Sequence, residues 1–125
     1  MEYINLLKFA KKQLFLKNIP NPSLDSEILL SDILKIKREK LLINLEQKAN
    51  LKQINQFKKY IDLRGNNKPV AYILGKKEFW KRNFIVNHSV LIPRPDTEII
   101  IEAILKILPV NIKKSILDIG TGSGC

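Results

Sequence analysis

The sequence of 125 residues predicts an α+β protein, in which an α-helical bundle is followed by a β-hairpin and the start of an α/β domain. Three observations predict this order. Apolar residues recur at helical spacing through the first half of the chain. β-branched and aromatic residues gather between positions 78 and 92. A short apolar run, 115–119, then leads into the glycine-rich segment 120–124.

The first two helices are predicted from apolar spacing and from the break between them. One helix begins near Tyr3, and its pattern stops at residues 18–22. A second starts with Pro22, whose fixed φ suits the first helical position, and Asn21 is its expected cap. The residues expected on the buried faces of these helices are Tyr3, Ile4, Leu7, Ala10, Leu14, Leu24, Ile28, Leu29 and Ile33.

A shorter apolar segment around residues 41–45 and a fourth helix complete the first half. Asn50 is a good cap for that fourth helix, and Gly65 is its expected C-terminal stop. Residues 1–64 are therefore expected to pack as a small helical bundle. The apolar face of the fourth helix consists of Leu51, Ile54, Phe57 and Ile61.

Strand-forming residues replace the helical pattern after Gly65. Residues 78–80 and 84–86 are predicted as two strands joined by a turn at 81–83, and residues 90–92 as further strand. Pro93 ends this run because proline cannot donate a hydrogen bond to a sheet.

A strongly apolar helix and a buried strand are predicted next. Asp96 or Thr97 can cap the helix, which runs to Leu108 and is stopped by Pro109. The run Ser115-Ile116-Leu117-Asp118-Ile119 is predicted as a buried strand that leads into the glycines.

The charge of the chain is high but evenly spread. There are 22 Lys and Arg against 12 Asp and Glu, a net charge of +10, with +5 in residues 1–62 and +5 in residues 63–125. Without a basic stripe or tail we do not expect direct nucleic-acid binding. The single cysteine, Cys125, excludes an internal disulfide and a cysteine-based zinc site. We expect a cytoplasmic monomer with no membrane span and no metal site.

The glycine-rich segment has the pattern D-x-G-x-G-x-G. A dinucleotide fingerprint, G-x-G-x-x-G, would place its third glycine at position 125, which is a cysteine, and no Lys-Ser/Thr follows as in a phosphate-binding Walker loop. The pattern is similar to motif I of class I S-adenosylmethionine-dependent methyltransferases. A glycine-rich turn without a ligand is the alternative.

Four blocks in order resemble the bacterial release factor glutamine methyltransferase family, also called HemK or PrmC, and the similarity covers the whole chain. The blocks are Arg64-Gly65 with Pro69-Val70-Ala71-Tyr72-Ile73-Leu74-Gly75; Glu78-Phe79-Trp80 with Phe84-Ile85-Val86; Val90-Leu91-Ile92-Pro93-Arg94-Pro95-Asp96-Thr97-Glu98; and Leu117-Asp118-Ile119-Gly120-Thr121-Gly122-Ser123-Gly124.

The resemblance implies a fold and a reaction. Residues 1–75 would form a helical domain that docks a class 1 peptide chain release factor. Residues 76–125 would form a hairpin linker and the truncated start of a Rossmann-like methyltransferase domain. The family transfers a methyl group from S-adenosylmethionine to the side-chain amide nitrogen, N5, of the Gln in the Gly-Gly-Gln motif of release factors.

The resemblance also implies site residues. Arg94 and Glu98 would border the cofactor and substrate cleft. The alternatives are a surface arginine between two prolines for Arg94, and a favourable charge in the first turn of a helix for Glu98. Asp118 could instead hold the loop by bonding to backbone N–H groups. The residues expected to bind the cofactor are Asp118, Gly120, Thr121, Gly122, Ser123 and Gly124.

The Asn-Pro-Pro-Tyr motif that orients the amide in this family is absent from the sequence, so we assign no catalytic residue. We therefore expect an N-terminal piece of the enzyme, with negligible S-adenosylmethionine binding by the chain alone. Two other functions are open. One is a non-catalytic helical module that binds protein, and the other is an amino-methyltransferase that acts on nucleic acid.

Overall fold

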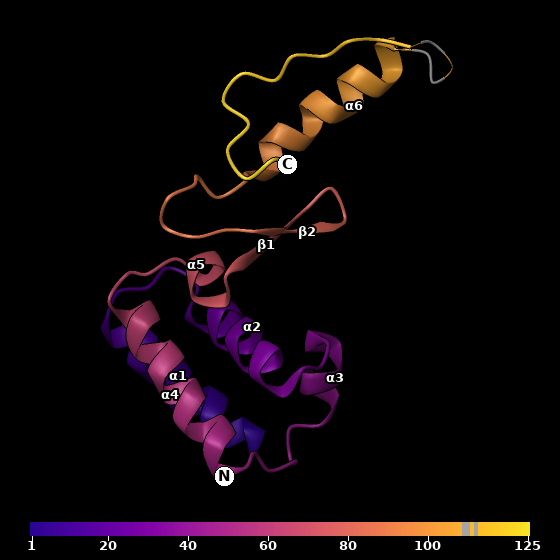
Figure 1. The fold of residues 1–125 in the computed structure, drawn as a ribbon. Coiled ribbons are helices and arrows are strands. Elements are labelled where there is room, and N and C mark those ends of the chain that lie inside the picture. The colour runs from indigo at the N-terminus through magenta and orange to yellow at the C-terminus, as the bar shows by residue number, and fades with distance from the viewer. Residues whose placement is uncertain (109–110, 112) are drawn as a thin grey trace. The chain divides into compact units, whose positions relative to one another are not determined.

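The computed structural model describes residues 1–108, 111 and 113–125, and Figure 1 labels its helices and strands. The chain divides into two compact units. Met1–Leu74 is termed the helical unit, and Gly75–Cys125 is termed the hairpin–loop unit. Helices together with an antiparallel strand pair agree with the predicted α+β class.

The helical unit consists of helices joined by short loops. The predicted helices are present, and a further short helix, α5, ends the unit. In chain order they are α1 (Tyr3–Leu16), α2 (Pro22–Leu34), α3 (Arg38–Ile43), α4 (Leu51–Gly65) and α5 (Val70–Leu74).

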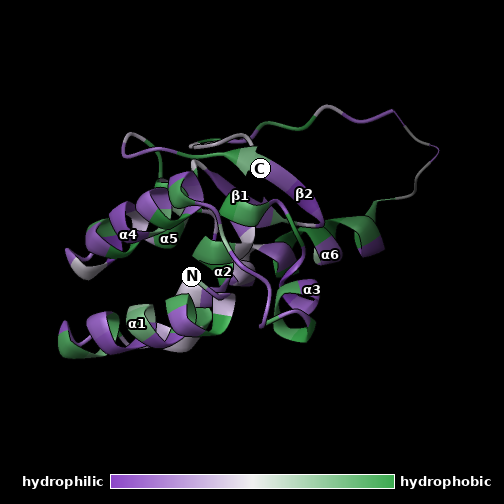
Figure 2. Ribbon diagram, turned by 90° about the horizontal axis from the view of Figure 1, so that it is seen from below, coloured by the Kyte–Doolittle hydropathy of each residue, from purple (hydrophilic) through white to green (hydrophobic). Residues whose placement is uncertain are grey.

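The core of the helical unit lies where α1, α2 and α4 pack together. Figure 2 shows hydrophobic and hydrophilic residues alternating along α1 and α4, as expected for helices that bury one face. Phe57 of α4 is completely buried and is the largest of the fully buried side chains in this core. Around it lie Tyr3, Leu6, Ala10, Leu14, Ile19, Leu29, Leu30, Ile33, Leu41, Ala49 and Ile61.

Backbone hydrogen bonds hold the N-terminus against the loop before α4. The N–H of Tyr3 donates to the carbonyl of Gln47 at 2.9 Å, and the N–H of Ala49 donates to the carbonyl of Met1 at 3.0 Å. Glu2 and Lys48 form an isolated antiparallel bridge between these segments. This pairing positions the start of α1 beside the segment that follows α3.

Two predicted helix starts are confirmed. Pro22 occupies the first turn of α2, although the side chain of Asn21 makes no capping hydrogen bond. Asn50 caps α4: its side-chain oxygen accepts from the N–H of Gln53, and the Gln53 side chain accepts from the N–H of Asn50, both at 2.9 Å. This reciprocal capping box satisfies two backbone donors that the helix itself leaves unpaired.

The predicted stop of α4 at Gly65 is confirmed, although Gly65 is not the left-handed residue that follows the helix. Gly65 is still helical, and the left-handed residue is Asn67, with φ of 62°. The N–H of Lys68 donates to the carbonyl of Leu63 and that of Asn67 to the carbonyl of Arg64, a Schellman pattern. Asparagine tolerates this conformation nearly as well as glycine, so it ends the helix here.

The predicted hairpin is confirmed with a tighter turn. Strand β1 (Lys76–Phe79) pairs antiparallel with β2 (Arg82–Ile85), and Phe79 lies opposite Arg82. Trp80 belongs to the turn rather than to the first strand, and residues 82–83 belong to the second strand rather than to the turn. Trp80 and Lys81 have φ of 49° and 58°. A two-residue turn with two positive φ angles matches the natural twist of paired strands.

The predicted strand at residues 90–92 is wrong, since the segment has no strand structure and the sheet in the described residues consists of β1 and β2. A 3₁₀ turn, η1 (Pro95–Thr97), leads directly into helix α6 (Glu98–Ile107). The predicted helix is therefore confirmed, although no side chain caps its start. The predicted stop at Pro109 lies outside the described residues.

The predicted buried strand at residues 115–119 is wrong. The segment has no strand structure, and Ile116, Leu117 and Ile119 are 69%, 84% and 87% exposed. A strand forms only where a neighbouring strand exchanges hydrogen bonds with it, and in the described residues only β1 and β2 pair. The Rossmann-like start is therefore not confirmed.

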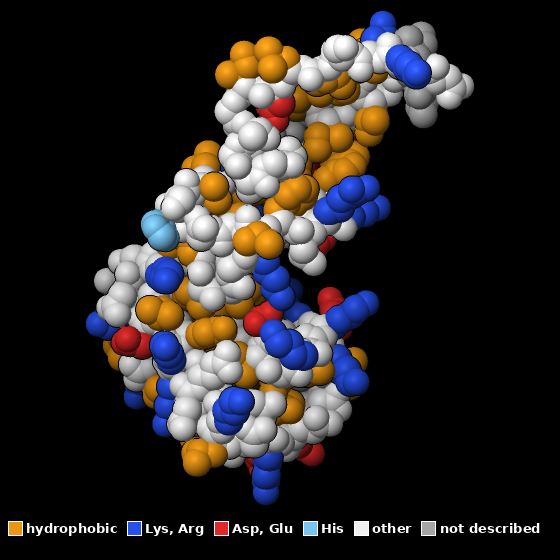
Figure 3. Space-filling view, viewed as in Figure 1, with side chains coloured by type: hydrophobic (Ala, Val, Ile, Leu, Met, Phe, Trp, Pro, Cys, Tyr) orange, Lys and Arg blue, Asp and Glu red, His pale blue; other side chains and the backbone are white. Residues whose placement is uncertain are grey.

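The surface is charged and partly apolar. On the face shown in Figure 3, Lys and Arg side chains are scattered over the helical unit without forming a continuous stripe. Hydrophobic side chains gather over α6, where Ile99, Leu105 and Ile107 are more than half exposed. Across the described ranges, no helix combines the length and the apolarity that crossing a membrane requires.

Candidate functional site

The glycine-rich loop of the hairpin–loop unit turns through three left-handed residues. Gly120, Gly122 and Gly124 have φ of 80°, 58° and 81°. The N–H of Gly124 donates to the carbonyl of Thr121 at 2.9 Å and closes a turn. Residues with a Cβ rarely adopt such angles, so the alternating glycines are required by the backbone path.

This loop borders a cavity of about 440 Å³ within the hairpin–loop unit. A cavity of this size is in the range that holds small molecules and cofactors. Its wall combines apolar side chains of α6 with a few polar groups from the loop and from η1. The lining residues are Phe79, Thr97, Ile100, Ile101, Ile104, Ile116, Leu117, Asp118, Gly120, Thr121 and Cys125.

Three features of the loop and of Asp118 before it bear on ligand binding. The buried Oγ of Ser123 has no hydrogen-bond partner among the described residues. Nothing lies within 4 Å of the position that a Cβ would occupy at Gly120 or Gly124, so the backbone there is open to close approach. Asp118 is exposed and makes no hydrogen bond to a backbone N–H in the described part of the chain. Its carboxylate is therefore available to a ligand.

The structure separates the predicted site residues into two groups. Asp118, Gly120 and Thr121 line the cavity, whereas Gly122, Ser123 and Gly124 belong to the same loop without lining it. Arg94 is exposed and does not line the cavity. Sequence reasoning did not single out Thr97 and Cys125, which do line it. Thr97 stands in the Pro-Arg-Pro-Asp-Thr-Glu block, the only signal that could have indicated it.

Glu98 ties the hairpin turn to the first turn of α6. Its Oε1 accepts a hydrogen bond from the N–H of Trp80 at 2.8 Å in a partly buried position. With Glu102 it lines a separate cavity of about 480 Å³, which Glu78, Trp80 and Lys81 complete. The carboxylate thus satisfies a donor in a strained two-residue turn.

Replacing Glu98 with alanine is expected to loosen that turn. Loss of a hydrogen bond to a charged group in a partly exposed site should shift the local opening equilibrium of the turn about tenfold toward the open state. The Trp80 amide should therefore exchange with deuterium about tenfold faster. Glu98→Gln keeps an acceptor oxygen and Glu102→Ala removes a carboxylate from the same cavity, so both should leave this rate nearly unchanged. NMR-detected exchange at Trp80 checks this. Equal rates in Glu98→Ala and the parent chain would contradict the hydrogen bond.

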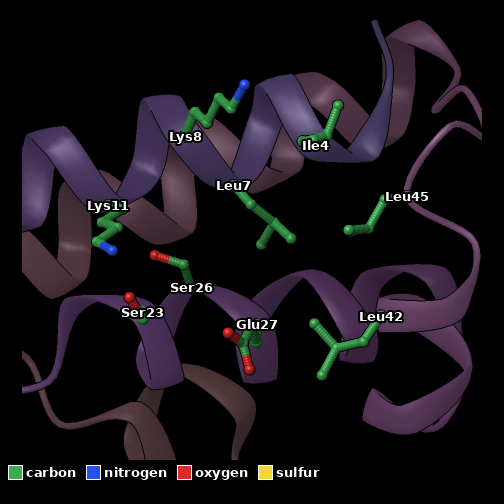
Figure 4. Close-up of a pocket in the computed structure, with 9 residues that line it drawn as sticks. All are labelled: Ile4, Leu7, Lys8, Lys11, Ser23, Ser26, Glu27, Leu42 and Leu45. Atoms are coloured by element: carbon green, nitrogen blue, oxygen red, sulfur yellow. The ribbon is translucent and has the colours of Figure 1, made fainter.

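The helical unit carries a second concave surface, shown in Figure 4. This groove has a volume of about 240 Å³ and is lined by residues of α1, of α2, of the end of α3 and of the segment that follows α3. Four apolar side chains, Ile4, Leu7, Leu42 and Leu45, line one part of it, and Lys8 and Lys11 belong to its α1 wall. In Figure 4, Leu7 points from α1 toward α2, and Lys11 lies near the serines of α2.

On the α2 wall of the groove, the carboxylate of Glu27 and the hydroxyl of Ser26 have partners within the protein. Oε2 of Glu27 accepts from Nε of Arg38 at 2.6 Å, an ion pair between α2 and α3. The hydroxyl of Ser26 donates to the carbonyl of Pro22 at 2.5 Å. By contrast, Lys8 and Lys11 are exposed and form no ion pair within the described residues. The described residues also contain no group of three or more His, Cys, Asp and Glu that could hold a metal ion.

Comparisons with known proteins agree with the resemblance stated from the sequence. Residues 5–75 match the family model described as the PrmC N-terminal domain. The chain is 44% identical over 123 residues to a release factor glutamine methyltransferase of Leptospira interrogans, which covers 98% of this chain and 43% of the relative. Its identity to the protein of the same name from Buchnera aphidicola subsp. Schizaphis graminum is 46% over 118 residues, covering 94% and 42%.

A third relative of the same name, from Coxiella burnetii, is 48% identical over 103 residues, covering 82% of this chain and 37% of that protein. The chain therefore spans about two fifths of the length of the curated relatives that it matches. The matched residues 5–75 include the whole α-helical part from α1 to α5 except its first turn. On these matches, the chain belongs to the PrmC N-terminal domain family.

Proposed function

We propose that this chain serves the S-adenosylmethionine-dependent methylation of the Gln side-chain amide nitrogen in the Gly-Gly-Gln motif of class 1 release factors. Residues 1–75 recognise the release factor, and residues 76–125 begin the domain that holds the methyl donor. The names of the relatives, release factor glutamine methyltransferases, support the substrate class. Because release factors act on cytoplasmic ribosomes, we propose the cytoplasm as the location and a monomer as the working form.

The observation that carries the proposal is the glycine-rich loop beside the 440 Å³ cavity. The left-handed glycines let a ligand approach the backbone of the loop. The free carboxylate of Asp118 has the charge to pair with the ammonium of a methionine group. When bound, S-adenosylmethionine supplies an electrophilic methyl group on a sulfonium.

The residues of this chain contribute binding and positioning. An amide nitrogen is a weak nucleophile because its lone pair is delocalised into the carbonyl, so the reaction depends on alignment and on electrostatic stabilisation. Ile100, Ile101 and Ile104 of α6 form an apolar wall on one side of the cavity. Arg94 and Glu98 stay proposed as residues that border the cleft, with Glu98 acting through the Trp80 turn.

A chimera tests this proposal. The chain replaces the matching 43% of the Leptospira relative, and radiolabelled S-adenosylmethionine reports methyl transfer to a purified release factor. We expect the chimera to methylate the release factor. Gly122→Ala should lower the rate about tenfold, because a Cβ disfavours left-handed backbone by ~1–2 kcal/mol. Gly65→Ala is the matched control, since Gly65 has no positive φ.

Each other outcome excludes the proposal in a recognisable way. Release-factor binding without methyl transfer would favour a non-catalytic binding module. Methylation of DNA adenine in preference to the release factor would favour an enzyme that acts on nucleic acid. Equal effects of Gly122→Ala and Gly65→Ala would show that the loop has no role in holding the methyl donor.

A further inference from the structure

The groove of the helical unit has an apolar part and a basic part, arranged along α1. Ile4 and Leu7 occupy one turn of the helix, and Lys8 and Lys11 follow each of them by four residues. Residues four apart lie on the same face of a helix, about 6 Å apart along its axis. Each apolar side chain therefore has a lysine directly beside it on the same wall.

The apolar part is wide enough to receive a side chain. Leu42 and Leu45 line the groove together with Ile4 and Leu7, and Leu7 points from α1 toward α2 in Figure 4. Leu42 remains 41% exposed. A neighbouring hollow of about 330 Å³ along residues 42–47 shares Leu42 and Leu45 and so extends the concave surface past α3. Burial of a leucine-sized side chain here would remove apolar surface of both partners from water.

The positive charge of the basic part is not neutralised by an acidic side chain within the described residues. Glu27, the acidic residue that lines the groove, is paired with Arg38, whereas Lys8 and Lys11 have no such partner within the described residues. The helical unit as a whole carries 14 Lys and Arg against 7 Asp and Glu, a net charge of +7. The surface therefore attracts negative charge beside an apolar site.

We infer that this groove docks an acidic amphipathic helix of the release factor. The helix places an apolar side chain against Leu7, Leu42 and Leu45, and a carboxylate one helical turn away against Lys8 or Lys11. The inference rests on the proposed function in one respect, that the partner is a release factor. A nucleic acid fits less well, because its phosphates need no leucines and the groove offers no aromatic ring for a base to stack on.

The experiment measures binding of a purified class 1 release factor to the full 125-residue chain by isothermal titration calorimetry. Lys8→Glu/Lys11→Glu tests the basic part, with Lys52→Glu/Lys59→Glu on the exposed face of α4 as the charge-matched control. Leu42→Ser tests the apolar part, with the 72% exposed Leu51→Ser as its control. All these side chains are at least partly exposed, so circular dichroism and thermal melting should show unchanged folding.

We expect about a tenfold loss of affinity in each groove variant and a change below about twofold in each control. Adding salt should weaken the parent complex and leave the Lys8→Glu/Lys11→Glu complex less sensitive. Equal losses of affinity in the groove and control variants would overturn the inference. It would also be overturned if transfer RNA displaced the release factor and bound through both Lys8/Lys11 and Lys52/Lys59.

The failures of the inference and of the proposed function are distinguishable. If the parent chain binds the release factor and the groove variants bind equally well, the docking site is wrong and the proposed function stands. If the parent chain does not bind the release factor at all, the proposed partner is wrong, and the inference is overturned with it.

Discussion

Replacing Phe57 with alanine is expected to lower the free energy of unfolding of the helical unit by about 3–5 kcal/mol. Phe57 is completely buried in the core between α1, α2 and α4. Its removal loses the burial of an aromatic ring and leaves a cavity that the surrounding helices fill only in part. The change would remove a large share of the stability of a domain of this size.

Chemical denaturation followed by circular dichroism measures this effect. Phe15→Ala is the matched control, because Phe15 lies on α1 and is 71% exposed, and its loss should be within about 0.5 kcal/mol. If Phe57→Ala does not fold, Phe57→Leu keeps most of the volume and should show a smaller loss that can be measured. Similar losses for Phe57→Ala and Phe15→Ala would contradict the packing described.

The second large effect is expected from Arg64→Ala. Nε of Arg64 and Oδ2 of Asp25 are 2.7 Å apart, and the two side chains are only 16% and 12% exposed. The substitution leaves the carboxylate of Asp25 buried and unpaired, so we expect a loss of about 3 kcal/mol. It also removes the hydrogen bond from Nη1 of Arg64 to the carbonyl of Lys68, which holds the chain after α4.

A second ion pair supplies the control for this prediction. Arg38 and Glu27 are also in contact, at 2.6 Å, but the Arg38 side chain is 48% exposed. Arg38→Ala should therefore cost at most about 1 kcal/mol. Chemical denaturation of both variants measures their free energies of unfolding. The double variant Asp25→Asn/Arg64→Ala tests whether stability recovers once the buried charge is removed. If the two arginine variants lose equal stability, burial does not govern the Asp25–Arg64 pair.

These pairs clarify what the Arg64-Gly65 block does. Arg64 connects α4 to α2 and to the segment that leads into α5, so it stabilises the helical unit. Gly65 is helical, and a Cβ there would meet only the Cγ of Lys17 at 3.4 Å. The block that contributed to the family resemblance thus has a structural explanation within this unit.

The sequence predicted the local structure well where local interactions decide it. Apolar spacing located α1, α2, α4 and α6, because a helix satisfies its own backbone hydrogen bonds and its apolar residues recur along one face. The cap at Asn50 was equally readable, since its partner Gln53 is three residues away. The hairpin was predicted for the same reason, with errors in the bounds of its strands and in the length of its turn.

The strand predicted at residues 115–119 failed because strands depend on distant partners. Alternation and apolarity mark a segment that could be buried, yet they do not supply the neighbour that must accept its hydrogen bonds. In the structure Ile116, Leu117 and Ile119 are exposed, although Ile116 and Leu117 line the cavity beside the loop.

The sequence by itself determined the family, the helices, the hairpin and the glycine pattern, because each depends on residues that lie close together along the chain. Only the tertiary structure decided which residues meet across the fold. It paired Asp25 with Arg64, joined Glu98 to the turn at Trp80 by a hydrogen bond, and brought Ile4 and Leu7 to one groove with Leu42 and Leu45. Such contacts depend on how helices pack in space, and the spacing of residues along one helix does not specify them.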